Sequence, residues 1–393
     1  MTAILGLRGT GQFDTDTRPK NYRELFTLLE PNGTAPLQAL LAMASSESTN
    51  DPEFKNFRDE LPNRTVQVNG ALGAGPTAVV IDNADDEAFL VGGALLKNLT
   101  SGEVMRVVSH NAGTNTITVV RGIAGSAAAL ADNEVLVIMG FADSEGGVSP
   151  DAVSFDAVIN SNYTQIFKTA VQVTGTLQNT FLRTGNKEQE AITKALKLHM
   201  SDIERSFFFG LKSEVNGSTA SPTRYTGGLL EQITNTTDAA TDPFNDGVGV
   251  ISETSFDKLL IESIFGFGSA EKVVFAGPRV ITNLQAMAKN RWQPTQVTGS
   301  YGVSMTRYST YAGDLMVHLH PMFRQVPALA NHAVILDMPY LKYRNMQNRD
   351  TQLQRNIQNN DVDGVKHQYL TECGLEMTHS KVHAVIKGWD AIS

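Results

Sequence analysis

The chain has 393 residues, of which 41% are hydrophobic, so its length corresponds to two or three domains with enough apolar material for a substantial core. Its 32 Lys and Arg residues against 41 Asp and Glu residues give a formal net charge of −9, and only 19% of residues are charged. Proteins that bind nucleic acids directly need a basic face that releases counterions from phosphate, and no Lys- or Arg-dense window supplies one. These numbers argue against disorder and against direct duplex recognition.

Cysteine usage and hydropathy restrict the setting in which the chain folds. The one cysteine, Cys373, cannot form an intrachain disulfide, which argues against a disulfide-stapled secreted scaffold. The longest apolar stretches contain glycines and are far shorter than the roughly 18 residues that cross a bilayer. The apolar run from Ala3 to Leu7 is too short for a signal peptide. We therefore expect a soluble, unexported protein.

Residues 1–50 lack the pattern of an independent domain. Glycines and prolines interrupt every periodic run except two short helical stretches, Tyr22–Leu29 and Pro36–Ala44. Apolar side chains without a core of their own are expected to lie against another surface. We therefore predict an arm with these apolar contacts: Leu25, Leu28, Leu29, Leu37, Leu40 and Leu41.

From Arg64 to about Gly140 the hydrophobic period changes to two, which is typical of short strands. The predicted strands are Ala78–Ile81, Glu103–Ser109, Thr116–Arg121 and Glu134–Met139. Residues 111–115 (NAGTN) have the composition of a hairpin loop between two of them. Strands at this spacing indicate an inserted module of about 75 residues, built as a small sandwich or barrel.

The strongest helical signal follows a predicted strand at Tyr163–Val173 and runs from Lys187 to Phe209. Asn186 is placed to cap the first turn. One face carries apolar or buried-type residues at spacings of three and four, namely Ile192, Leu196, His199, Ile203 and Phe207. At 1.5 Å per residue such a helix is about 34 Å long, so it can traverse a domain.

The remaining sequence predicts an α/β region followed by long strands. Residues 216–249 resemble surface loops because Gly, Ser, Thr and Asn dominate them. The predicted elements beyond them are a helix at Glu253–Phe265, a strand at Lys272–Ala276, a helix at Arg279–Lys289, and strands at Leu315–Leu319 and Ala333–Leu336. The tail segments Gly364–Met377 and Lys381–Ile386 read as strands that return to pair with distant parts of the chain.

A search for catalytic, cofactor and metal motifs finds none. His318 and His320 share a strand face and His379 and His383 are four apart, but no third ligand sits at a zinc-like spacing, so structural imidazoles are favoured. Cys373 lies in a predicted buried strand, where a thiol packs as a small hydrophobe. We predict no catalytic residue, no cofactor and no metal.

Several runs of residues, in chain order, resemble one family of proteins. They are Asp51–Pro62 with Arg64, Gly102–Met105, Thr118–Gly122, the hexapeptide Asn162, Tyr163, Thr164, Gln165, Ile166 and Phe167, Val173–Thr176, and the helix with His199, Ile203, Glu204 and the closing pair Phe209 and Gly210. Together they resemble the SU10-like major capsid (major head) proteins of tailed bacteriophages over most of residues 50–390. That family is similar to the Hong Kong 97 (HK97) type of shell protein.

The resemblance implies an α+β HK97-like fold with the following parts. Residues 1–50 would be an arm whose leucines contact a neighbouring subunit, residues 51–64 and 141–174 an extended loop, and 65–140 a β module mounted on it. Residues 175–250 would form a peripheral domain with the long helix as its spine, 251–340 an axial domain, and 341–393 returning strands.

The same resemblance implies hexamers and pentamers that form an icosahedral head around double-stranded DNA. Its partners would be copies of itself, a portal protein, and scaffolding or decoration proteins, without a membrane. Assembly would take place in the cytoplasm of a host bacterium, and the product would be a virion component without enzymatic activity. An encapsulin-like compartment shell and, less favoured, a β-rich enzyme with an unrecognised site remain as alternatives.

Overall fold

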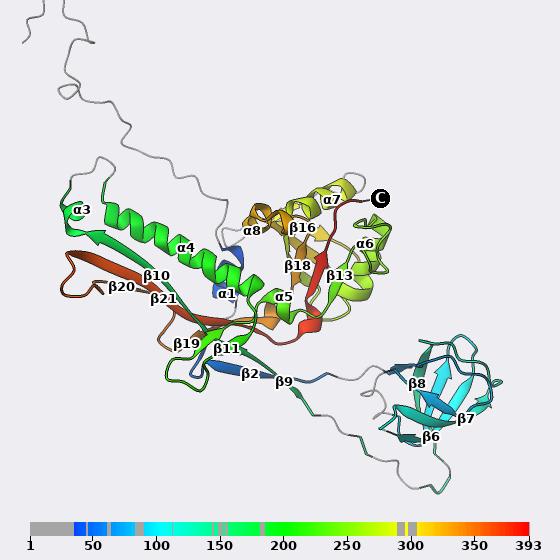
Figure 1. Ribbon diagram of the computed structural model, residues 1–393. Helices are drawn as coiled ribbons and strands as arrows, with labels where there is room; N and C mark the ends of the chain where they lie inside the picture. The colour runs from blue at the N-terminus through cyan, green and yellow to red at the C-terminus, as the bar shows by residue number, and fades with distance from the viewer. Residues whose placement is uncertain are drawn as a thin grey trace, which may run out of the picture. The chain divides into compact units, whose positions relative to one another are not determined.

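The computed structural model describes residues 35–60, 64–82, 90–143, 145–147, 152–153, 156–180, 185–288, 295–297 and 305–392, apart from positions 45 and 112. The chain divides into two compact units. The body comprises residues 1–56 and 160–393, and the barrel unit comprises residues 57–159. Helices and strands are mixed in the body, so the protein has the predicted α+β class (Figure 1).

The first sheet of the body is built around one long strand, β21 (Gly364–Met377). On one side β10 (Gln165–Thr174) pairs with it antiparallel, from Gln165 opposite Cys373 to Thr174 opposite Gly364. On the other side lie β19 (Leu341–Met346) and β20 (Gln352–Gln354), and β1 (Ser46–Thr49) pairs parallel with β19. The predicted tail strand Gly364–Met377 therefore has its predicted bounds and pairs with distant segments.

The long helix α4 (Lys187–Phe209) also has its predicted bounds, and it lies along β10 and β21 (Figure 1). Asn186 caps it, because its Oδ1 accepts hydrogen bonds from the amides of Glu188 and Gln189 at 2.9 and 3.3 Å. Four of the five predicted face residues are buried, whereas Leu196 is half-buried against a small cluster that includes Ile192 and Tyr369. The short helix α3 (Gly175–Asn179) precedes α4.

The second sheet of the body has seven strands. In spatial order they are β13 (Thr236–Asp238), β22 (Ala384–Lys387), β18 (Ala333–Leu336), β14 (Glu271–Ala276), β17 (Asp314–Leu319), β16 (Met305–Ser309) and β15 (Thr295–Val297). Every residue of β18 is buried, as expected for a central strand covered on both faces. Alternate residues divide between two cores: Val334 and Leu336 face one, and Ala333 and Ile335 the other.

One of these cores lies between the second sheet and two helical segments. These segments are α6 (Glu253–Leu259), which continues as a π-helical turn (Leu260–Ile264), and α7 (Pro278–Ala288). The remaining short elements of the body are β11 (Ser213–Val215), β12 (Thr223–Tyr225), α5 (Leu229–Gln232), α8 (Pro321–Gln325), and single 3-10 turns at Pro327–Leu329, Met338–Tyr340 and Ser380–Val382. The prediction of loops throughout 216–249 was therefore wrong, since β12, α5 and β13 lie there and β13 joins the sheet.

The other core joins the two sheets and takes in the helix α1 (Pro36–Ala44). Leu37, Leu40 and Leu41 are buried in it together with Phe207 and Phe208 of α4. These three leucines were predicted to contact a neighbouring subunit, but the structure packs them inside their own chain, where Leu37 and Leu41 are fully covered and Leu40 is 7% exposed. Leu25, Leu28, Leu29 and the predicted helix Tyr22–Leu29 lie outside the described residues.

The barrel unit has a separate apolar core lined by six strands. Their order is β3 (Thr65–Gln67), β8 (Val135–Phe141), β5 (Ala94–Asn98), β6 (Val104–Asn111), β7 (Thr116–Ala124) and β4 (Ala78–Val80). A bridge between Val68 and Ile81 joins the first strand of this order to the last, which closes the sheet into a barrel. The predicted 111–115 hairpin connects β6 to β7, with Asn115 at a φ of 50°.

A two-stranded ribbon carries the chain between the units. It consists of β2 (Glu53–Arg58) and β9 (Val158–Tyr163). The predicted strand Tyr163–Val173 is thus two elements: β9 belongs to the ribbon, Thr164 separates them, and β10 belongs to the large sheet. A strand that changes sheets needs such a break, because the two ladders pair with different partners.

Candidate functional site

The helix α1 is fixed to the body by a buried carboxylate on α4. Glu204 is 1% exposed, and its Oε1 and Oε2 accept hydrogen bonds from the amides of Leu37 and Gln38 at 2.9 and 3.0 Å. These amides belong to the first turn of α1, where backbone N–H groups have no partner within the helix and the helix dipole favours negative charge. Glu204 therefore caps a helix that is 167 residues away in the sequence.

His320 completes this contact from the second sheet. Its Nδ1 accepts a hydrogen bond from the Met322 amide at 3.2 Å, so the ring hydrogen resides on Nε2 and is donated to Glu204 Oε1 at 2.9 Å. Phe208, Phe275 and Phe323 surround the ring, with centroid distances of 4.8, 5.4 and 5.1 Å. The aromatic enclosure keeps water away from the pair and so strengthens its hydrogen bond.

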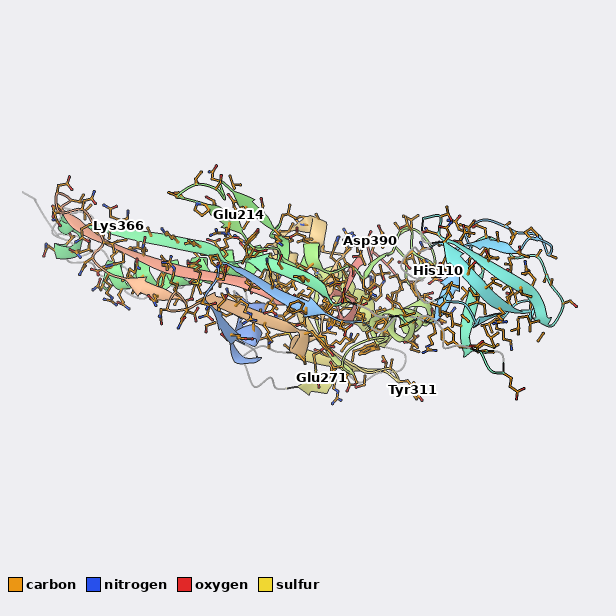
Figure 2. The ribbon with its side chains drawn as sticks, turned by 90° about the horizontal axis from the view of Figure 1, so that it is seen from below. His110, Glu214, Glu271, Tyr311, Lys366 and Asp390 are labelled. Atoms are coloured by element: carbon orange, nitrogen blue, oxygen red, sulfur yellow. The ribbon has the colours of Figure 1, made fainter. Side chains whose placement is uncertain are left out.

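A second buried histidine ties the middle of α4 to the large sheet. His199 Nδ1 lies 2.9 Å from Thr169 Oγ1 on β10, and its Nε2 lies 2.8 Å from Thr371 Oγ1 on β21. Burial lowers the pKa of His199, so the neutral ring is the stable form. Near the start of α4, His367 Nε2 lies 2.9 Å from Glu188 Oε1. His367 follows Lys366, which Figure 2 labels near one end of β21.

The hexapeptide Asn162 to Phe167 forms the junction between the ribbon and the body. Asn162 is buried, and its Nδ2 donates to the carbonyls of Gly227 and Leu375 at 2.9 and 2.7 Å. Its Oδ1 accepts from the amides of Gly227 and Tyr163 at 2.7 and 2.8 Å. One side chain thus joins β9, β21 and the loop that follows the hairpin β11–β12. Figure 2 labels Glu214 on this hairpin.

The other residues of the hexapeptide have separate roles. Thr164 Oγ1 donates to Glu372 Oε1 at 3.2 Å, and Gln165 Oε1 accepts from the Thr226 amide at 3.2 Å. Phe167 is buried in the core that joins the sheets. Tyr163 lies under the Lys212 ammonium, 5.3 Å from its ring centroid, whereas Ile166 is 49% exposed. Five of the six side chains therefore contact other parts of the body.

The residues examined for catalysis or metal binding have structural partners instead. His318 packs edge-on against Phe275, and His379 against Tyr340. His383 Nδ1 accepts from the Asp337 amide at 3.1 Å. Burial raises the pKa of the Cys373 thiol. Within the part of the chain that the structure describes, no group of three or more His, Cys, Asp and Glu side chains could hold a metal ion, and no helix is long and apolar enough to cross a membrane.

Two buried charged contacts were missed in the sequence. Glu204 lies among apolar positions of α4, between Ile203 and Phe207, and a carboxylate in an apolar stripe is a signal for a buried partner. In the barrel, Arg121 donates to Glu103 at 2.7 Å, and both side chains are almost fully covered. Burial raises the pKa of Glu103, but bonds from Arg121 and the Ala128 amide outweigh it and leave the pKa below its usual value. Glu103 and Arg121 both lie in runs that carry the family resemblance, Gly102–Met105 and Thr118–Gly122.

Comparisons with known proteins give a consistent result. A family model described as SU10 major capsid protein matches residues 8–390. The major capsid protein of Pseudomonas phage PaMx41 is 24% identical over 416 residues, covering 99% of this chain and 96% of that protein.

Two solved structures are also similar to this chain. The capsid of cyanophage A-1(L) has a TM-score of 0.48 at 9% identity, covering 97% of this chain and 99% of that one. The SrpI encapsulin complex from Synechococcus elongatus has a TM-score of 0.42 at 13% identity, covering 60% and 78%. Because the family model spans nearly the whole chain, the protein belongs to the SU10 major capsid protein family and is a structural shell protein of a phage virion.

Proposed function

We propose that this capsid protein assembles into hexamers and pentamers that close into an icosahedral head of the HK97 type around double-stranded DNA. Residues 1–50 form the arm, and residues 51–64 and 141–174 the extended loop that carries the β module at 65–140. The peripheral domain at 175–250 has α4 as its spine, 251–340 form the axial domain, and 341–393 return through both. The seven-stranded sheet adds β13 and β22 to the axial part, and α1 ties the arm to the body.

The observation that carries this proposal is the apolar surface of the ribbon. Phe57 of β2 and Ile159 of β9 are 71% and 58% exposed. Val158, which precedes Ile159 and points to the opposite face of the ribbon, is 68% exposed. Single exposed apolar residues are common on soluble proteins, but large apolar side chains gathered on two paired strands favour a surface that a partner covers. In a shell protein the partner nearest at hand is a second copy of the same chain.

The charge of the chain supports the enclosure of DNA without a tight grip on it. A formal net charge of −9 supplies no general attraction to phosphate, so packaged DNA would not be held by counterion release. A portal protein would admit the DNA, and scaffolding or decoration proteins would act during assembly in the cytoplasm of the host bacterium. The chain itself would carry out no catalysis.

Microscopy of the assembled protein tests the proposal. We expect the full chain, expressed in bacterial cells, to sediment as large particles that negative-stain images show as closed shells with six-fold and five-fold units. Heads purified from infected cells are expected to protect double-stranded DNA from nuclease. Shells that enclose a protein cargo would point to an encapsulin-like compartment, and small discrete particles to an enzyme; either outcome would contradict the proposal.

A further inference from the structure

Two amide side chains, one from each strand of the ribbon, bind the same backbone oxygen of the body. Asn56 Nδ2 on β2 donates to the Met377 carbonyl at 3.1 Å, and Asn160 Nδ2 on β9 donates to it at 3.2 Å. Met377 is the last residue of β21, and it is buried. A carbonyl oxygen has two lone pairs, so these two donors fill its hydrogen-bonding capacity.

Packing next to this carbonyl leaves the ribbon little freedom. Phe54 of β2 is buried against Gly374 of β21, where an added Cβ would lie 2.8 Å from the Phe54 ring and 2.6 Å from the Tyr163 carbonyl oxygen. The Thr164 amide also donates to the Pro52 carbonyl at 2.8 Å. Only glycine at position 374 therefore permits the ribbon to lie this close to the sheet.

The two asparagines are also the residues at which the chain leaves the body. The body ends at Asn56 on β2 and begins again at Asn160 on β9. The exposed residues Phe57 and Ile159 directly follow and precede them. At this boundary each strand thus donates a hydrogen bond to one shared atom.

We propose that Asn56, Asn160 and the Met377 carbonyl form a clamp that sets the direction in which the ribbon leaves the body, and so where its apolar residues meet a second copy of this chain. The inference rests on the proposed function, since it concerns contact between subunits. The asparagines are positioning residues: they bind the body, and they act on assembly through the ribbon that they hold.

The double variant Asn56→Leu and Asn160→Leu tests the clamp, because leucine has a similar size and cannot donate. In the unassembled subunit we expect hydrogen exchange of the β2 and β9 amides to become roughly tenfold faster, as for the loss of a hydrogen bond, while α4 keeps its protection. In assembly we expect shells of mixed diameter or open sheets in place of uniform closed shells. Restoring either asparagine alone should recover part of both properties.

Asn235→Leu is the matched control. Asn235 Nδ2 also donates to a backbone carbonyl of the body, that of Ser263 at 3.3 Å, but Asn235 lies outside the ribbon. This variant should leave ribbon exchange and shell diameter unchanged. The clamp would be overturned if hydrogen exchange of the β2 and β9 amides were unchanged in the double variant, whether or not shells form. It would also be overturned if the double variant formed uniform closed shells of wild-type diameter. Failure of the wild-type chain to form shells would instead count against the proposed function.

Discussion

The barrel and the body are stabilised in different ways. The strands of the barrel pair only with one another, and one buried ion pair, Glu103 with Arg121, links the loops beside its apolar core. In the body, distant segments meet: α1 on α4, β13 on β22, and β1 on β19. Polar side chains also join remote segments of the body: Glu204 binds α1, His199 binds β21, and Asn162 joins β9 to β21. A unit whose strands pair only among themselves can change without the body, whereas a single polar residue of the body holds segments that are remote in the sequence.

The chain offers a probe that separates the two units. Residues 57–159 contain no tryptophan, whereas Trp389 is buried in the body, so tryptophan fluorescence follows the unfolding of the body and circular dichroism follows both units.

The largest expected effect comes from breaking the ion pair of the barrel. Glu103→Ala leaves the Arg121 guanidinium buried without its carboxylate, which costs about 3–5 kcal/mol. We expect circular dichroism in urea to show early unfolding of the barrel, with an unchanged tryptophan midpoint. Asp132→Ala, which removes an exposed acceptor for the Gly70 amide, should have a much smaller effect. A fluorescence midpoint that moves with the Glu103 variant would show that the two units are coupled.

A comparable loss is expected in the body when Glu204 is removed. Glu204→Ala leaves two amides of α1 and the Nε2–H of His320 without their acceptor, at a cost of about 3–4 kcal/mol. This time the tryptophan midpoint should fall, and exchange at the α1 amides should become fast. Asp202→Ala on the exposed side of the same helix serves as the control. If α1 keeps its protection in the Glu204 variant, the cap does not hold it.

A smaller effect concerns acid stability. Burial, with a contribution from Lys272, lowers the pKa of His383 from 6.5 to about 3. Below pH 6.5 the unfolded chain takes up a proton that the folded chain does not, so stability present at neutral pH is lost as the pH falls. Between pH 6.5 and pH 5 the lowered pKa of His383 reduces the free energy of unfolding by about 2 kcal/mol.

His383→Gln should therefore flatten the pH dependence of the unfolding free energy over that range. The groups near the ring are Lys272, whose ammonium donates to three backbone carbonyls, and Asp337, whose amide donates to His383. His199 and His332, whose pKa values are also lowered, remain in the variant and supply the residual slope. An equal slope in variant and wild type would mean that His383 titrates normally.

Local patterns predicted the local parts of the structure. The period of four and three gave both ends of α4, and the alternating pattern gave four strands of the barrel. The strand β3 was missed because only one of its three residues, Val66, is apolar, and β5 was also missed. The burial of Leu37, Leu40 and Leu41 could not be predicted locally, because the residues that cover them lie far along the chain. Phe207 and Phe208 share their core, and Glu204 accepts the Leu37 amide. A sequence pattern shows that a side chain needs cover, but it does not identify which surface provides it.

The closed form of the barrel has a consequence for a molecule that is packed beside many copies of itself. An open sheet presents a row of unpaired N–H and C=O groups at its edge, and the edges of neighbouring molecules can pair with each other and aggregate. Because Val68 bridges to Ile81, the outermost strands of the six satisfy one another. Barrels held at the high local concentration of a shell then offer one another few unpaired backbone groups, so contacts between barrels are left to side chains.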